Sequence, residues 1–131
     1  MCDCIAEFEG RQLTSSAGEK WYSNSRLVYH AAGGIDGLSY SSSREAMDQC
    51  ILNGNAVIEI DFLFTSDGEL VCLHGWTDVG GLETACTLDE FKNLKIYGKY
   101  TPMTAEDALE KGAYGIYTDF LTEEDINSIM K

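Results

Sequence analysis

The sequence predicts a single α/β domain in which short apolar strands alternate with short amphipathic helices. Apolar runs of strand length recur between residues 27 and 118, polar-capped helical segments separate them, and glycine-containing turns end several of these elements. The 131 residues, 44% of them hydrophobic, are enough for one core. We expect residues 1–25 to form a polar lead-in segment and residues 26–131 to form the domain.

The first predicted elements are a strand and a helix. The apolar run of residues 27–30 leads into a glycine-rich loop, residues 31–37, which is typical of a buried strand that ends in a turn. A helix is expected next, because Ser42 and Glu45 have the spacing of a capping box and Gly54 is suited to end a helix. Its apolar face consists of Ala46, Met47, Cys50 and Ile51.

A second strand is predicted over residues 56–62, which are apolar except at Glu59 and Asp61. A strand that is apolar on both faces is typical of a parallel strand covered by helices. The Thr-Ser-Asp-Gly turn of residues 65–68 then leads to a third strand over residues 70–74. In a hairpin centred on this turn, His74 would lie beside Asp61.

The remaining elements follow from capping signals. Helices are predicted over residues 87–94 and 104–111, because each begins at a threonine that is followed three residues later by an acidic residue. Gly112 is expected to end the second of these helices. A last strand over residues 113–118 and a terminal helix that starts at Thr122 complete the domain.

Charge and composition restrict the partners. Nine basic and 22 acidic residues give a net charge of −13, which opposes binding to nucleic acid and to anionic lipid surfaces and favours cations. No apolar run approaches the roughly 18 residues that a membrane helix needs, and no signal peptide is recognised, so we expect a cytoplasmic protein without a transmembrane segment. The five cysteines are expected to be reduced thiols.

Glu59 and Asp61 are the first candidate functional residues. Side chains alternate between the faces of a strand, so these two carboxylates share one face, about 6.5–7 Å apart, and Ile58, Ile60 and Phe62 occupy the other. Two anions in an apolar strand are costly unless a cation neutralises them. Oxygen ligands suit Mg²⁺ or Ca²⁺, and the pattern favours such an ion over the structural alternative, an arginine or lysine partner.

The two histidines of the chain are the second candidates. His30 and His74 each end a predicted strand just before a glycine-containing loop, next to the predicted carboxylate pair. Two imidazoles that flank a divalent cation can act as general acid and general base when an alkoxide is displaced from a phosphodiester. Gly33 and Gly34 could offer backbone N–H groups to a phosphate oxygen, or could simply form a tight turn.

These motifs together resemble a known family. A histidine in Val-Tyr-His-Ala-Ala-Gly-Gly (residues 28–34) precedes Ser-Arg-Glu-Ala-Met (residues 43–47) and the Glu-x-Asp, Thr-x-Asp-Gly and second histidine of residues 58–74. This order resembles the glycerophosphodiester phosphodiesterase family, within the phosphatidylinositol phospholipase C-like superfamily. Residues 101–104 resemble the family's Pro-Thr helix start and residues 112–119 its closing strand, so the resemblance covers about residues 26–122.

The resemblance implies a (β/α)₈ barrel in which His30 and His74 form the acid–base pair and Glu59 and Asp61 bind Ca²⁺ or Mg²⁺. The implied reaction is the hydrolysis of a glycerophosphodiester to an alcohol and glycerol 3-phosphate. A complete barrel takes roughly 250 residues, so the expected fold is a truncated (β/α)₈ TIM-barrel-like fold that lacks several central β/α units and, with them, a third carboxylate ligand.

Two sequence differences bear on this expectation. Ala31 stands where many family members carry a phosphate-binding arginine, and residues 40–43 read Tyr-Ser-Ser-Ser in place of the family's Pro-Glu-Asn-Thr. A few strands cannot close a barrel alone, so we expect a homodimer that completes it. Two alternatives stay open. One is an inactive relative that binds a divalent cation or a phosphorylated ligand. The other is a metal-independent, phospholipase C-type phosphodiesterase, and the absence of a basic residue at position 31 counts against it.

Overall fold

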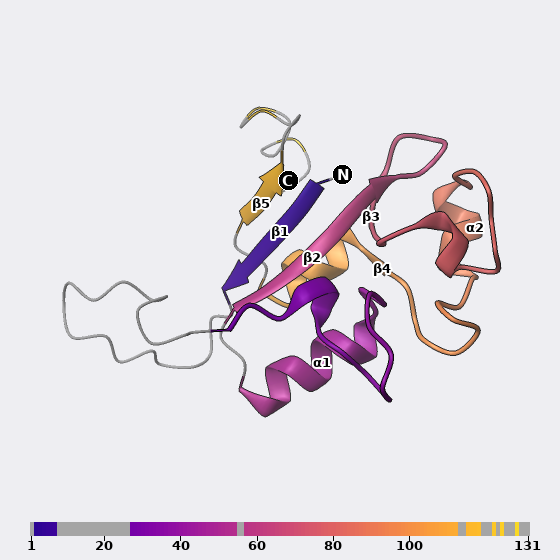
Figure 1. Ribbon diagram of the computed structural model, residues 1–131. Helices are drawn as coiled ribbons and strands as arrows, with labels where there is room; N and C mark the ends of the chain where they lie inside the picture. Colours follow the sequence, from indigo (N-terminus) through magenta and orange to yellow (C-terminus); the bar gives the residue numbers. More distant parts are fainter. Residues whose placement is uncertain are drawn as a thin grey trace.

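The computed structural model describes residues 2–7, 27–54, 57–112 and 115–118, together with Thr122, Glu124 and Ser128 (Figure 1). Most of the predicted lead-in and most of the predicted terminal helix lie outside the described residues. In chain order the elements are β1 (Cys2–Glu7), the short 3-10 helix η2 (His30–Ala32), α1 (Arg44–Asn53), β2 (Val57–Phe64), β3 (Leu70–Cys72), the 3-10 helix η3 (Trp76–Asp78), α2 (Leu88–Lys92), β4 (Met103–Thr104), α3 (Ala105–Glu110) and β5 (Gly115–Thr118).

One five-stranded sheet runs through the domain, in the order β4-β3-β2-β1-β5 (Figure 1). Each pair of neighbouring strands is antiparallel. The expectation that residues 56–62 form a parallel strand is therefore wrong for β2, because a tight turn returns the chain directly into β3 and such a turn can join only antiparallel strands. Among the described residues, the parallel contact of β2 is a single bridge between Tyr29 and Ile58.

The segment Cys2–Glu7 is part of this sheet. It forms β1, which pairs with β2 from Cys2↔Phe62 to Glu7↔Val57 and with β5 on its other edge. The sequence analysis expected no strand here, because six residues with two acids carry no apolar run. The strand is formed by pairing with β2, a partner about fifty residues further along the chain.

The residues before η2 do not form the buried strand that was predicted. Leu27 and Val28 are 62% and 59% exposed. Of the described residues 27–29, Tyr29 alone joins the sheet: its N–H donates to Val57 O at 3.0 Å, and its carbonyl accepts from Glu59 N at 2.9 Å. This single bridge is enough to place the next residue, His30, at the edge of β2.

The strand–turn–strand prediction for residues 56–74 is confirmed. Phe62 lies opposite Cys72, and Gly68 supplies the positive φ of the turn, +85°. The register differs from the predicted one by one residue. Leu73 N donates to Asp61 O at 2.9 Å, so Leu73, rather than His74, lies opposite Asp61.

Helix α1 begins one residue later than predicted. Ser42 has a φ of +44° and cannot cap, because an N-cap residue needs extended backbone; Ser43 has that backbone, and its side chain accepts a hydrogen bond from Ala46 N. Glu45 forms no capping box, since its carboxylate accepts hydrogen bonds from Thr101 N and Oγ1. Gly54 ends the helix in the left-handed conformation, as predicted.

The two predicted threonine caps are confirmed as complete capping boxes. Thr87 and Glu90 begin α2, and Thr104 and Asp107 begin α3. Both helices are shorter than predicted, five and six residues long. Neither of them, nor any other helix among the described residues, has the length and apolar character needed to span a bilayer.

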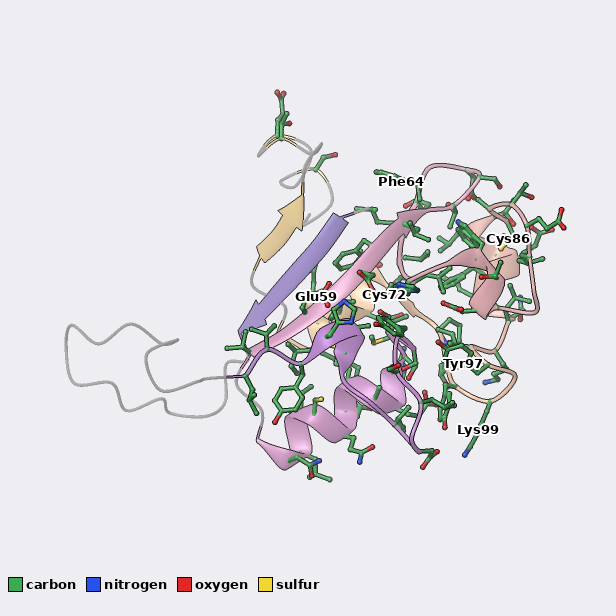
Figure 2. All side chains as sticks on the ribbon, in the orientation of Figure 1. Glu59, Phe64, Cys72, Cys86, Tyr97 and Lys99 are labelled. Carbon is green, nitrogen blue, oxygen red and sulfur yellow. The ribbon has the colours of Figure 1, made fainter. Side chains whose placement is uncertain are left out.

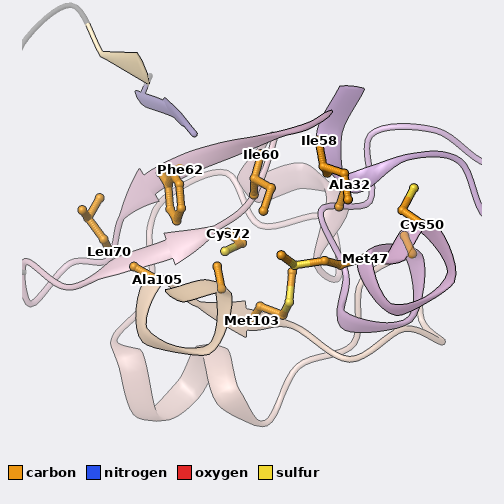
Figure 3. Close-up of a cluster of buried hydrophobic side chains, with 12 residues drawn as sticks. Ala32, Met47, Cys50, Ile58, Ile60, Phe62, Leu70, Cys72, Met103 and Ala105 are labelled. Atoms are coloured by element: carbon orange, nitrogen blue, oxygen red, sulfur yellow. The ribbon is translucent and has the colours of Figure 1, made fainter. Parts of the chain in front are cut away.

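Two hydrophobic clusters cover the two faces of the sheet. Figure 3 shows the first cluster, in which Ile58, Ile60 and Phe62 of β2 point toward α1 and α3. Its other buried members are Ala32, Ala46, Met47, Cys50, Leu70, Cys72, Met103, Ala105 and Ala108. The second cluster contains Val71, Leu73, Val79, Phe91, Ile96 and Tyr100. Within the described part of the chain, Cys50 and Cys86 are free thiols, as predicted, and Cys72 Sγ donates a hydrogen bond to Thr104 O at 3.4 Å.

Candidate functional site

Three of the predicted site residues lie together. His30, Glu59 and Asp61 each offer a ligand atom, and these atoms all lie within 4.8 Å of one another. Oε2 of Glu59 is 3.6 Å from Nε2 of His30. Asp61 is only 1% exposed, and the Glu59 side chain is 12% exposed. The alternation of β2 therefore directs the carboxylate pair away from the Ile58–Ile60–Phe62 face and toward the turn that carries His30.

The η2 turn brings His30 to this position. Ala31 and Ala32 have positive φ angles, +48° and +65°, which L-residues adopt at a cost. The turn gains a compensating hydrogen bond, because Ala31 N donates to Glu59 Oε2 at 2.8 Å. Figure 2 shows Glu59 beside this turn. One carboxylate thus holds the backbone that follows His30 and also faces the His30 imidazole.

His74 follows β3 and has a carboxylate neighbour of its own. Nδ1 of His74 lies 3.5 Å from Oδ2 of Asp78, which belongs to η3. This is an ion-pair distance rather than a hydrogen bond, so Asp78 lies beside Nδ1 without fixing the orientation of the ring. Asp78 is not among the site residues predicted from the sequence. Its spacing of four residues from a candidate histidine is the signal that could have identified it.

Tyr40 connects the two histidines. Its ring centroid lies 5.0 Å from that of His30, in an edge-to-face arrangement, and 4.6 Å from that of His74, tilted by 39°. The structure therefore brings both predicted histidines to opposite sides of one aromatic ring. Sequence analysis noted Tyr40 only as a departure from the family's Pro-Glu-Asn-Thr motif.

The chemistry of the donor set fits Ca²⁺ or Mg²⁺. Two carboxylates, one of them buried, offer the hard oxygen ligands that these ions prefer. The described ion pairs of Arg44, Lys99 and Lys111 are with Asp107, Asp36 and Asp48, and not with Glu59 or Asp61. Ala31 is fully buried and carries no charge, so the position after His30 supplies no cation.

Gly33 and Gly34, the predicted phosphate-binding residues, differ in their surroundings. Gly33 N donates to His30 O at 2.8 Å, so the turn already uses this amide. A Cβ on Gly33 would lie 2.3 Å from Cys50 Sγ, and its φ of +88° with ψ of 168° is a conformation that only glycine adopts readily. Gly34 is exposed and has an ordinary φ.

Comparisons with known proteins do not identify a family. No protein-family profile matches the chain, and a search of curated proteins finds no match. The function proposed below therefore relies on the geometry of the site and on the resemblance of its motifs.

Proposed function

We propose that this chain is a metal-dependent phosphodiesterase that hydrolyses a glycerophosphodiester to an alcohol and glycerol 3-phosphate. The observation that supports this most directly is the cluster of His30, Glu59 and Asp61, whose ligand atoms lie within 4.8 Å of one another. A second imidazole, His74, contacts the same tyrosine ring as His30. Two imidazoles beside a pair of carboxylates can supply acid–base catalysis and a cation site together.

In this proposal Glu59 and Asp61 hold Ca²⁺ or Mg²⁺. Both ions prefer oxygen ligands, so the His30 imidazole stays available for proton transfer. The bound ion supplies Lewis-acid stabilisation of the charge that develops on the phosphoryl oxygens. The net charge of −13 supports cation uptake, because the field of an acidic protein attracts divalent ions.

The histidines perform the proton transfers. One imidazole, in its neutral form, accepts the proton of the attacking hydroxyl. When that hydroxyl belongs to water, glycerol 3-phosphate forms directly; when it is a neighbouring hydroxyl of the glycerol, a cyclic phosphate forms first and a water must open it in a second step. The other imidazole, in its protonated form, donates a proton to the oxygen of the leaving alcohol. Glu59 and Asp78 lie 3.6 Å and 3.5 Å from the two imidazoles, close enough to stabilise a protonated ring during these transfers.

We also propose that the domain descends from a (β/α)₈ barrel and works as a homodimer. The first point has its support in the resemblance of the motifs; the single parallel bridge between Tyr29 and Ile58 has the direction of strand pairing in a barrel, whereas every pair of neighbouring strands in the sheet is antiparallel. The exposed side chains of Leu27, Val28 and Phe64 support the second, since a partner copy could cover them. A sedimentation mass of one chain would contradict the dimer.

The test is the release of glycerol 3-phosphate from glycerophosphocholine, with Ca²⁺, with Mg²⁺ and with a chelator. We expect turnover that needs the metal and that falls about 10²–10⁴-fold in His74→Ala. Glu69→Gln, a change at an exposed carboxylate of the β2–β3 turn, is the control and should keep wild-type turnover.

Two other results would overturn the proposal. Turnover that persists in chelator would indicate the metal-independent, phospholipase C-type reaction. No turnover with either ion would indicate an inactive relative that binds a cation or a phosphorylated ligand.

A further inference from the structure

Tyr40 is the described side chain whose ring contacts both candidate catalytic histidines, at centroid distances of 5.0 Å and 4.6 Å. We propose that Tyr40 is a positioning residue that holds His30 and His74 in a fixed relation across the site. This inference rests on the proposed function, because it assigns Tyr40 a role in the same acid–base chemistry.

The histidines need such a constraint. Their side chains are 57% and 39% exposed, so the protein interior restricts neither ring tightly. A general acid and a general base must nevertheless both reach one phosphodiester, and a misplacement of about 1 Å can reduce a rate about 100-fold. One aromatic ring that packs against both imidazoles couples their orientations, which two separate contacts would not do.

Tyr40 can perform this role because its own backbone is held on both sides. The preceding carbonyl, Ser39 O, accepts a hydrogen bond from Tyr97 OH at 2.8 Å. On the other side Ser42 N donates to Ala31 O at 3.0 Å, which ties the loop to the η2 turn. Tyr40 itself has a φ of +63°, an uncommon value for a bulky residue that persists only where the surroundings enforce it.

The ring, rather than the hydroxyl, carries this role. The contacts of Tyr40 with the histidines are between ring planes, an edge-to-face and a tilted arrangement. Tyr40→Phe keeps the ring and should keep the function. Tyr40→Leu keeps most of the apolar volume, loses the flat ring and should release both imidazoles.

The first experiment measures the imidazoles directly. The chain has two histidines, so their ring C–H signals in an NMR spectrum can each be assigned with His30→Ala and His74→Ala. Because Tyr40 exerts a ring current on both, we expect both signals to move in Tyr40→Leu and to stay near their wild-type positions in Tyr40→Phe. Unmoved signals in Tyr40→Leu would overturn the proposal, whatever the activity.

The second experiment measures turnover of glycerophosphocholine with the folded variants, folding being checked by thermal melting. We expect kcat to fall about 10–100-fold in Tyr40→Leu, with KM within about threefold of wild type, and Tyr40→Phe to restore kcat. An unchanged kcat in Tyr40→Leu, or an equal loss in Tyr40→Phe, would overturn the positioning role.

The two experiments separate this inference from the proposed function. If the wild-type chain shows no turnover, the phosphodiesterase proposal fails. The NMR comparison of Tyr40→Leu with Tyr40→Phe still decides whether the Tyr40 ring lies against both histidines, which the positioning role requires.

Discussion

Oε2 of Glu59 lies 3.6 Å from Nε2 of His30 and accepts a hydrogen bond from the next backbone amide, Ala31 N, at 2.8 Å. A residue of β2 therefore faces the His30 side chain and holds the backbone at the start of η2 by a hydrogen bond. In the proposed site Glu59 is also a metal ligand. Its loss should affect the turn and the cation together, whereas the loss of His30 should affect only proton transfer.

Thermal stability and turnover together distinguish a metal ligand, the role proposed for Glu59, from a proton-transfer residue, the role proposed for His30. A cation that binds only the folded chain raises its stability, by about 2.7 kcal/mol at a concentration 100 times the Kd. We expect His30→Ala to keep the Ca²⁺- or Mg²⁺-dependent rise in Tm but to lose turnover, and Glu59→Gln to lose both. Thermal melting with and without the ion checks this, with Glu69→Gln as control.

A cation-dependent rise that disappears in His30→Ala would contradict this assignment. His30 would then be a metal ligand, and His74 would remain as the candidate for proton transfer.

The contact between Gly33 and Cys50 permits a double-mutant cycle. Gly33→Ala should lower the free energy of unfolding by about 2–4 kcal/mol, because the new methyl group meets the Cys50 sulfur and the backbone conformation suits only glycine. Adding Cys50→Ala should recover the part of this loss that comes from the clash with the Cys50 sulfur. The part that comes from the strained backbone of residue 33 should remain. Denaturant unfolding of the single and double variants measures both parts.

Gly34→Ala is the matched control for this cycle. Gly34 has an ordinary φ, and its new Cβ would lie 3.3 Å from Leu38 O, so we expect a smaller loss, below about 1 kcal/mol. Equal losses at Gly33 and Gly34 would contradict the packing argument.

Asp36 should make stability depend on pH. A hydrogen bond from Tyr100 OH, together with the Lys99 ammonium, holds the pKa of Asp36 below its ordinary value of 3.8. A lowered pKa in the folded state means that the charged carboxylate stabilises the fold above pH 3.8, and that this contribution is lost as the pH falls through the folded-state pKa. We expect Asp36→Asn to melt below wild type at pH 7 and this difference to shrink in acid.

The same hydrogen bond raises the pKa of Tyr100 above its ordinary value of 10.0. Its contribution is therefore complete below pH 10 and is lost as the pH rises through the folded-state pKa. Tyr100→Phe keeps the buried ring, removes the donor and should move the Asp36 pKa back toward 3.8. Parallel curves of Tm against pH for wild type and Asp36→Asn would contradict the prediction.

The elements that the sequence predicted well depend on chemistry between close neighbours in the chain. The turn at residues 65–68 forms because Gly68 can adopt a positive φ and because Thr65 Oγ1 donates to Asp67 Oδ1 at 2.6 Å. The caps of α2 and α3 depend on side chains three residues apart. The shared face of Glu59 and Asp61 follows from the two-residue period of any strand.

The elements that the sequence predicted poorly depend on competition between distant segments. Ser42 and Glu45 could have formed a capping box, but Ser42 has a φ of +44° and Glu45 accepts two hydrogen bonds from Thr101, so the cap lies at Ser43. Residues 27–30 could have formed a strand that pairs with β2, but β2 makes most of its hydrogen-bonded pairs with β1 and β3.

The sequence by itself therefore determined the β2–β3 hairpin, the two threonine caps and the direction of the carboxylate pair, because each depends on residues within a few positions of one another. Only the tertiary structure decided that Cys2–Glu7 joins the sheet and that Tyr40 lies between His30 and His74. These contacts join residues separated by tens of positions. No local pattern specifies them, because they depend on which segments the folded chain brings to each of the two edges of β2.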